Sequence, residues 1–291
     1  MKQTFEVQKK LILIFAILLI EISVSAQKPS IEWATIPAGT FTMGSYDNEV
    51  NRNVNETQHQ VTLSAFSMSK YEITVGQFKE FVDATGYTTD AERGTNGIFG
   101  SQYWTGETFL LHYGLDWSND MWGYKRPIME FNHPVIHVSW NDALTFAQWM
   151  GCRLPTEAEW EYACRAGTTT PFNTGNNLTT IQANYNGNHP YKNYAKGKNR
   201  GKTMPVGSFP PNAWGLYDMH GNVSEWCDDW YSDYEIMAQT NPKGGRSGSH
   251  RIIRGGNWYT NAQFCRSACR NNYRTPGDRD CLTGFRIVSL K

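Results

Sequence analysis

The segment that decides the fold reads Arg153-Leu-Pro-Thr-Glu-Ala-Glu-Trp-Glu-Tyr-Ala163. Thr156 and Glu159 form a capping box, in which each side chain hydrogen-bonds the backbone N–H of the other at the start of a helix. Trp160 and Cys164 lie four residues apart and share one helix face, so the pattern predicts a helix that packs inward. Gly167 is predicted to end it.

Short elements are predicted on both sides of this helix. One helix is expected from about Thr74 to Ala84, and another from Ala143 to Met150, which Gly151 ends. The strands predicted from alternating or β-branched runs are Ile31–Ile36, Phe41–Gly44, Gln60–Leu63, Val135–Val138, Arg251–Arg254 and Phe285–Val288. The glycine-rich, aromatic or polar segments 90–122, 189–202 and 233–250 are predicted as loops.

Residues 1–26 have the pattern of a secretory signal. Lys2, Lys9 and Lys10 precede an apolar run over 11–20, and small residues end at Ala26. The run is too short to span a bilayer comfortably. We therefore predict cleavage after Ala26, export to the periplasm or the medium, and one domain over 27–291; an uncleaved N-terminal anchor is the alternative.

The charge balance gives no reason to expect nucleic acid or an anionic membrane as partner. The chain has 27 basic and 27 acidic residues, and the signal contributes three lysines and two glutamates, which leaves the mature part near −1. Binding to polyanions relies on a basic excess, which is absent here.

Six cysteines follow the signal: Cys152, Cys164, Cys227, Cys265, Cys269 and Cys281. An even number in an exported chain favours disulfides, and sequence alone leaves their pairing open. Cys265 and Cys269 are the alternative case, because neighbouring arginines lower a thiol pKa and could make them reactive.

The stretch from Asp218 to Trp226 reads Asp-Met-His-Gly-Asn-Val-Ser-Glu-Trp. Asp218 and Glu225 offer carboxylate oxygens, and Gly221 lets the backbone turn so that carbonyls can point inward. Carboxylate and carbonyl oxygens around a tight turn suit calcium, although an ordinary polar turn is the alternative.

The histidines are predicted to be structural. His133 and His137 flank a predicted strand without a third ligand in view, so they do not indicate a metal site. His220 is predicted to be a surface side chain within the acidic turn.

Together these segments resemble the formylglycine-generating enzyme family, also called sulfatase-modifying factors. The motifs that carry the resemblance are Ile36–Gly44, His133–Ala143, Arg153–Ala163, Asn212–Asp218, Gly221-Asn222-Val223 with Glu225-Trp226, Arg254-Gly255-Gly256 and Gly284-Phe285-Arg286. They cover nearly the whole mature chain.

The resemblance implies a single α/β (α+β) domain, C-type-lectin-like, low in regular secondary structure and stabilised by calcium. It implies calcium ligands at Asp218, at the carbonyls of Gly221 and Val223, and at Glu225. A second family site would use Asn184 and the Tyr185 carbonyl. Its other ligands would come from the loop before Pro205, whose lysines argue against a second cation.

The resemblance also implies an activity. The family's enzymes use oxygen to convert a sulfatase cysteine into formylglycine, with a single copper(I) held by two cysteines after the Gly-Gly motif, and soft thiolates suit this ion. Counting from Gly255-Gly256 places the second cysteine at Cys265 and the first at Thr260. A hydroxyl is a poor copper(I) ligand, so the pair is incomplete, and Cys265 could be structural and paired with Cys164.

Two classes of function remain. One is an oxidase acting on an exported sulfatase peptide, with Cys265 as the surviving thiol, Cys269 as its substitute partner and copper as the cofactor. The other is a non-catalytic exported module that binds a peptide, a glycan or an assembly partner, with the aromatic loops at Tyr103-Trp104 and Trp117–Trp122 lining a groove.

An iron-dependent oxidase is a third hypothesis, since related domains occur in sulfoxide synthases. Those enzymes use an additional helical domain that supplies histidines, and this chain has no room for one.

Overall fold

The computed structural model describes residues 28–95, 97–270 and 274–290. Its strands are β1 Trp33–Ile36, β2 Gly39–Met43, β3 His59–Leu63, β4 Phe66–Ser69, β5 Ser101–Trp104, β6 Phe109–His112, β7 Cys152–Arg153, β8 Ser224–Trp230, β9 Gln239–Thr240, β10 Arg251–Arg254, β11 Thr283–Gly284 and β12 Val288–Ser289. Its α-helices are α2 Val75–Thr85, α3 Asp90–Arg93, α4 Trp140–Met150 and α5 Glu157–Arg165, and its 3-10 turns are η1 Ile128–Glu130 and η2 Ala262–Cys265. The predicted signal lies outside the described residues.

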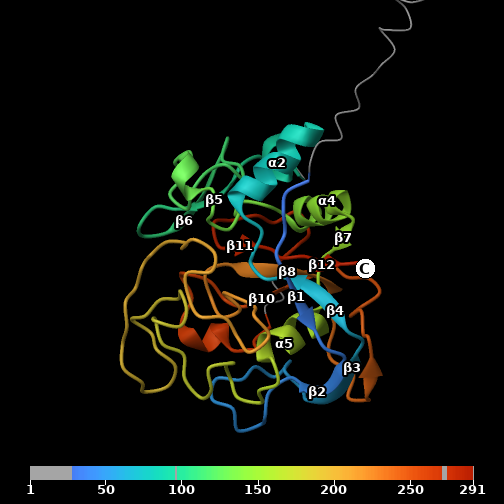
Figure 1. Cartoon of the computed structure of the whole chain (residues 1–291). Coiled ribbons are helices and arrows are strands. Elements are labelled where there is room, and N and C mark those ends of the chain that lie inside the picture. The colour runs from blue at the N-terminus through green and yellow to red at the C-terminus, as the bar shows by residue number, and fades with distance from the viewer. Residues whose placement is uncertain (1–27, 96, 271–273, 291) are drawn as a thin grey trace, which may run out of the picture.

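A small mixed sheet occupies the centre of the molecule. β10 runs antiparallel and β11 parallel to β8, the middle strand. A second sheet has the order β1-β4-β12-β7, a third the order β2-β3-β9, and β5 and β6 form a hairpin. In Figure 1, α2 and α4 lie above the β10-β8-β11 sheet and α5 lies below it. The mixed sheets, few helices and long irregular connections confirm an α+β domain low in regular structure.

Helix α5 forms as its sequence predicts. Thr156 Oγ1 accepts from Glu159 N and the Glu159 carboxylate accepts from Thr156 N, so the capping box is complete. Trp160 and Cys164 are both fully buried. The helix ends one residue earlier than predicted, because Ala166, with φ 45°, adopts the left-handed conformation expected of Gly167.

Two apolar clusters pack on either side of the central strands. One joins α5 to β1, β3 and β4 through residues such as Trp160, Ile36 and Met68. The other joins α2 and α4 to β8 and the C-terminal segment through Phe78, Phe146 and Phe285, whose rings lie 5.4–6.4 Å apart. The fold therefore relies on aromatic anchors, as expected of a chain with short elements.

Several predicted elements differ from the structure. Val135–Val138 is irregular rather than a strand, because His137 has φ 61°. Phe285–Val288 is a strand only at its end, in β12. Helix α4 starts three residues earlier than predicted, since Ser139 caps it.

The segment 90–122 is not all loop, because it contains α3 and the β5–β6 hairpin, and 233–250 contains β9. No helix of the described residues is long and apolar enough to cross a membrane.

Substituting the α5 cap tests the importance of this helix start. Thr156→Ala removes the acceptor for Glu159 N, so we expect the free energy of unfolding to fall by about 1 kcal/mol. Chemical denaturation followed by tryptophan fluorescence measures this. Thr35→Ala, at an exposed position of β1, is the control and should change stability by no more than about 0.5 kcal/mol. Equal effects of the two substitutions would contradict the role of the cap.

Candidate functional site

The acidic turn is as tight as its sequence predicts. The φ angles of Asp218, Gly221 and Asn222 are 59°, 111° and 61°. β8 begins directly after it at Ser224, so the turn delivers Glu225 into the middle strand of the central sheet. Sequence reasoning did not predict this strand, because its polar residues do not alternate with apolar ones.

Glu225 is held by an arginine. Arg286 donates from Nε to Glu225 Oε2 at 2.6 Å and from Nη2 to Oε1 at 2.7 Å, and Trp160 Nε1 donates to the same Oε2 at 2.7 Å. All three side chains are buried. A bidentate guanidinium and an indole N–H thus satisfy this carboxylate within the protein.

Two more carboxylates lie beside this pair. Asp218 Oδ2 accepts from Gly207 N at 2.7 Å, and burial raises the pKa of Asp218 to about 6. Glu72 accepts from Asn222 Nδ2 at 2.8 Å and from Val223 N at 3.2 Å. Burial and the nearby Asp218 raise the pKa of Glu72 well above its usual range. Sequence reasoning missed Glu72, because nothing in its local sequence indicates that it reaches the turn.

These contacts do not fit the calcium site predicted at Asp218, Gly221, Val223 and Glu225. The strongest predicted ligand, Glu225, already neutralises Arg286, and a calcium ion bound there would lie next to a fixed guanidinium. Asp218 Oδ1 is buried without a hydrogen-bond partner among the described residues.

The second predicted site uses Asn184 and the Tyr185 carbonyl, together with the loop before Pro205. Asn184 Nδ2 donates to the Lys202 carbonyl at 2.9 Å, so Asn184 does meet the loop before Pro205. Its Oδ1 has no partner in the described structure. The Tyr185 side chain is buried in a small apolar cluster, and its hydroxyl donates to the Leu178 carbonyl.

Substituting Arg286 tests whether this arginine or a calcium ion stabilises the buried carboxylates. Arg286→Met leaves Glu225 buried without its partner, so we expect a loss of about 3–5 kcal/mol in the free energy of unfolding. The matched control Lys70→Met breaks the exposed pair with Glu32 and should cost less than about 1 kcal/mol. We also expect the melting temperature of the parent protein to be the same with calcium and with a chelator. A calcium-dependent rise would restore the calcium site.

The Gly-Gly turn brings position 260 to a cysteine. Gly255 and Gly256 have φ of 97° and 72°. A Cβ on Gly256 would lie 2.6 Å from Cys265 Sγ and 3.1 Å from Thr260 Oγ1, so no side chain fits there. Thr260 Oγ1 itself lies 3.8 Å from Cys265 Sγ. The structure therefore places a hydroxyl against the thiol, at the position where the resemblance implies the first cysteine.

The thiols around this turn are protonated at neutral pH. Burial raises the pKa of Cys265 to about 12 and that of Cys269 to about 11, in the second case despite the opposing charge of Arg266. Cys164 is fully buried, with its Sγ 3.8 Å from the ring nitrogens of His220 and 3.6 Å from Ser267 Oγ. Cys269 Sγ contacts Asn53 Nδ2 at 4.0 Å.

The prediction of disulfides differs from the structure. All six cysteines are among the described residues, and all are free and buried. The pairing of Cys164 with Cys265 is not formed either. Cys164 is instead buried in α5 and Cys265 against the Gly-Gly turn, and burial stabilises the uncharged thiol.

Counting thiols checks this arrangement. Alkylation after unfolding in denaturant without reductant should modify all six cysteines of the purified protein, because each is a free thiol. In the native protein the same reagent should react slowly, since all six are buried and protonated. Intact-mass spectrometry measures both. A denatured sample that takes up only four or fewer alkyl groups would contradict the free thiols.

The histidines serve the fold. His133 Nδ1 lies 2.9 Å from Thr203 Oγ1, and His137 lies between Ser101 Oγ and the Asp120 carbonyl at 2.9 and 3.0 Å. Burial lowers the pKa of each to about 4, so both are neutral. The prediction of a surface position for His220 is wrong: it is buried, accepts from Asn173 N and lies 2.7 Å from the Cys265 carbonyl. The closely packed turn that follows Asp218 places the His220 side chain in the interior.

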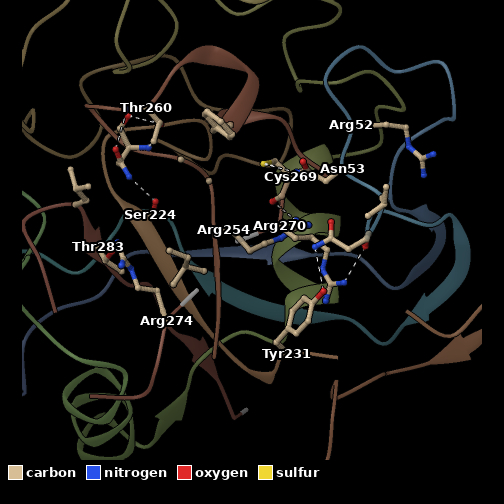
Figure 2. Close-up of a pocket in the computed structure, with 18 residues that line it drawn as sticks. Arg52, Asn53, Ser224, Tyr231, Arg254, Thr260, Cys269, Arg270, Arg274 and Thr283 are labelled. Carbon is tan, nitrogen blue, oxygen red and sulfur yellow. Dashed lines mark hydrogen bonds between the residues drawn. The ribbon is translucent and has the colours of Figure 1, made fainter. Parts of the chain in front are cut away.

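A cavity of about 710 Å³ opens beside Thr260. Figure 2 shows side chains from several distant segments around it. Its lining residues are Arg52–Asn55, Ser224, Tyr231, Ile253–Asn257, Thr260, Phe264, Cys269, Arg270, Arg274, Leu282 and Thr283. Each strand of the central sheet contributes at least one residue to this lining. Asn257 Nδ2 donates to Oγ of Ser224, the first residue of β8, at 3.0 Å. Cys265 lies behind the wall rather than in it.

The two aromatic loops predicted to form a groove lie in different places. Trp104 packs on Tyr259, with ring centroids 4.9 Å apart, and Tyr259 is the neighbour of Thr260. Trp117 is buried in the α2–α4 core, whereas Trp122 is exposed. Only the Tyr103-Trp104 part of the prediction therefore approaches the cavity.

The described residues form a mixed α/β domain, and the similarity of the chain to known proteins identifies its family. Residues 21–291 match the family described as the sulfatase-modifying factor enzyme 1-like domain, and the chain belongs to that family. It is 37% identical to the formylglycine-generating enzyme of Mus musculus, over 87% of this chain and 74% of the relative. It is 37% identical to that of Streptomyces coelicolor, over 87% and 88%. The structure of PvdO from Pseudomonas aeruginosa is similar, with 30% identity, a TM-score of 0.70, and coverage of 90% and 95%.

Proposed function

We propose that this protein is a peptide-binding member of the family that lacks the two-thiolate copper reaction. The observation that carries the proposal is the Thr260–Cys265 contact of 3.8 Å. A copper(I) ion needs two soft donors at this position, and the pair offers one hydroxyl and one thiol whose pKa is raised to about 12. This donor set does not fit the ion.

The cavity supports binding. Its volume of about 710 Å³ is within the range of ligand pockets, and it combines apolar walls such as Ile253 and Leu282 with polar groups. The relatives in mouse and Streptomyces are formylglycine-generating enzymes, and the family resemblance implies that such enzymes act on a sulfatase polypeptide. We infer that this cavity still binds a polypeptide, although the copper reaction is lost.

The oxidase is the second candidate function. Cys265 and Cys269 are both free thiols, as that reaction requires. However, Cys265 Sγ contacts Thr260 Oγ1 and the Asn261 carbonyl, whereas Cys269 Sγ faces Asn53. The two sulfurs face different neighbours, and neither environment favours a thiolate. The contacts therefore favour binding over oxidation.

We also propose that the protein is exported, with cleavage after Ala26. The support is the order of lysines, apolar run and small residues in 1–26. Mass spectrometry of the mature N-terminus tests it, and a protein that retains Met1 would refute the cleavage.

Restoring the missing thiol tests the proposal. We expect Thr260→Cys to bind copper(I) at least about tenfold more tightly than the parent protein, because it adds a second sulfur beside Cys265. Competition with a colorimetric copper(I) chelator measures this, and Thr260→Ser is the matched control that should bind no better than the parent.

The parent protein should bind a cysteine-containing sulfatase peptide without changing it. Incubation with the peptide, copper and oxygen, followed by mass spectrometry, should show no aldehyde product. Formation of the aldehyde by the parent protein, or tight copper(I) binding without the substitution, would overturn the proposed function in favour of the oxidase.

A further inference from the structure

The cavity beside Thr260 has an unusual charge distribution. Four arginines line it: Arg52, Arg254, Arg270 and Arg274. None of the described residues that line it is an aspartate or a glutamate. Figure 2 shows Arg254 and Arg270 near the centre of the view and Arg52 and Arg274 on opposite sides. We call these four side chains the arginine wall.

The carboxylates that pair with the arginine wall all lie outside the cavity lining. Arg270 donates to Glu157 at 2.7 and 2.9 Å, and Arg254 pairs with Glu161 of the same helix, α5. These glutamates neutralise the charges of Arg254 and Arg270 from helix α5, and neither glutamate lines the cavity. The arginines line the cavity and their carboxylate partners do not, which favours a positive potential in the cavity.

The other two arginines are more exposed, with 23% of the Arg52 side chain and 30% of the Arg274 side chain accessible to solvent. Arg274 donates from Nη2 to Asp280 at 2.6 Å. Arg52 pairs with Asp47 at 2.7 Å, but the Asp47 side chain is 97% exposed. An exposed partner is screened by water and contributes little. Arg52 is therefore the arginine of the wall whose charge is least compensated.

Buried donors in the same wall have no acceptor. Among the described residues, the Thr283 hydroxyl and Arg274 Nε are buried without a hydrogen-bond partner, whereas Arg254 Nε forms an ion pair with Glu157 Oε1 at 3.7 Å. Arg254 and Thr283 are each only 1% exposed. A buried donor without a partner is unfavourable by an amount comparable to a lost hydrogen bond, so an acceptor in the cavity would stabilise the Thr283 hydroxyl and Arg274 Nε.

One acceptor in the wall is also unsatisfied. Asn55 Oδ1 is buried without a partner in the described structure, and it lies in the lining with Val54 and Tyr231. A ligand that combines an anionic oxygen with an N–H donor and an aliphatic part would match these groups. A peptide carrying a carboxylate has all three features.

We propose that the arginine wall binds a carboxylate of a peptide, either an acidic side chain or a C-terminal carboxylate. This inference rests on the proposed peptide-binding function and specifies its ligand. Guanidinium groups bind planar carboxylates through paired hydrogen bonds, and here the wall adds the Thr283 hydroxyl as a further donor. The apolar lining at Ile253 and Leu282 would hold the aliphatic part of the peptide.

The test uses the mature full-length protein and three hexapeptide libraries that are random except for one central position, fixed as Glu, Gln or Lys. Each library is made with a free C-terminal carboxylate and with a C-terminal amide. Retained peptides are identified by mass spectrometry after equilibrium capture. We expect the Glu-amide library to be retained at least about tenfold better than the Gln-amide library if the side chain is bound. The free-acid Gln library should exceed its amide by the same factor if the terminus is bound.

Two variants locate the contact. Thr283→Val removes the unpartnered hydroxyl and keeps the shape of the side chain, and Arg274→Gln removes one charge. Each should lower the affinity of a retained acidic peptide several-fold. In Arg274→Gln the affinity should also fall less steeply as sodium chloride rises from about 50 to about 300 mM. Arg246→Gln, at an exposed arginine outside the cavity, is the matched control and should have no effect. Thr283→Val keeps the test valid if Arg274→Gln does not fold.

The outcomes separate the two proposals. Equal retention of acidic and amidated libraries overturns the carboxylate inference and leaves peptide binding standing. Retention of no library at all overturns peptide binding itself. Displacement by inorganic phosphate without discrimination between Glu and Gln libraries also overturns the inference, because it identifies a general anion site.

Discussion

The buried pair between Arg286 and Glu225 is the contact on which the rest of the structure depends. Arg286 comes from the C-terminal segment and Glu225 from the middle strand β8. The same guanidinium also donates to the carbonyls of Ser69, Lys70 and Tyr217. An arginine whose charge is removed from water is tolerated only when its hydrogen bonds are complete, so this one residue fixes four segments relative to one another. The cavity is lined by residues of the central sheet, whose middle strand Arg286 holds through Glu225.

The starts of α2 and α5 and the turn after Asp218 could be predicted from sequence because their causes are local. The capping boxes of α2 and α5 and the turn after Asp218 depend on residues within a few positions, and all three are present. The long motifs also indicated the family, and with it the α+β fold and the position of Thr260 opposite Cys265.

The parts that were missed depend on distant residues. Whether Glu225 meets a calcium ion or an arginine is decided by Arg286, 61 positions away. Glu72 reaches the turn across 150 positions, and His220 is buried because the chain around it folds back onto Cys265. Free or paired cysteines likewise depend on which sulfurs the fold brings together. No local pattern contains this information, whereas each contact is plain once the chain is folded.

The arginine wall has a consequence for how recognition could be regulated. A guanidinium stays protonated across the whole physiological pH range, and the carboxylates that compensate the wall lie on α5, at the buried Asp280 or at the surface. Neither the sign of the cavity potential nor its strength would then respond to mild acidification of the surroundings. Any dependence of binding on pH would come from the ligand, whose own carboxyl group loses its charge first. The protein would therefore present a constant electrostatic surface to a ligand over this range of pH.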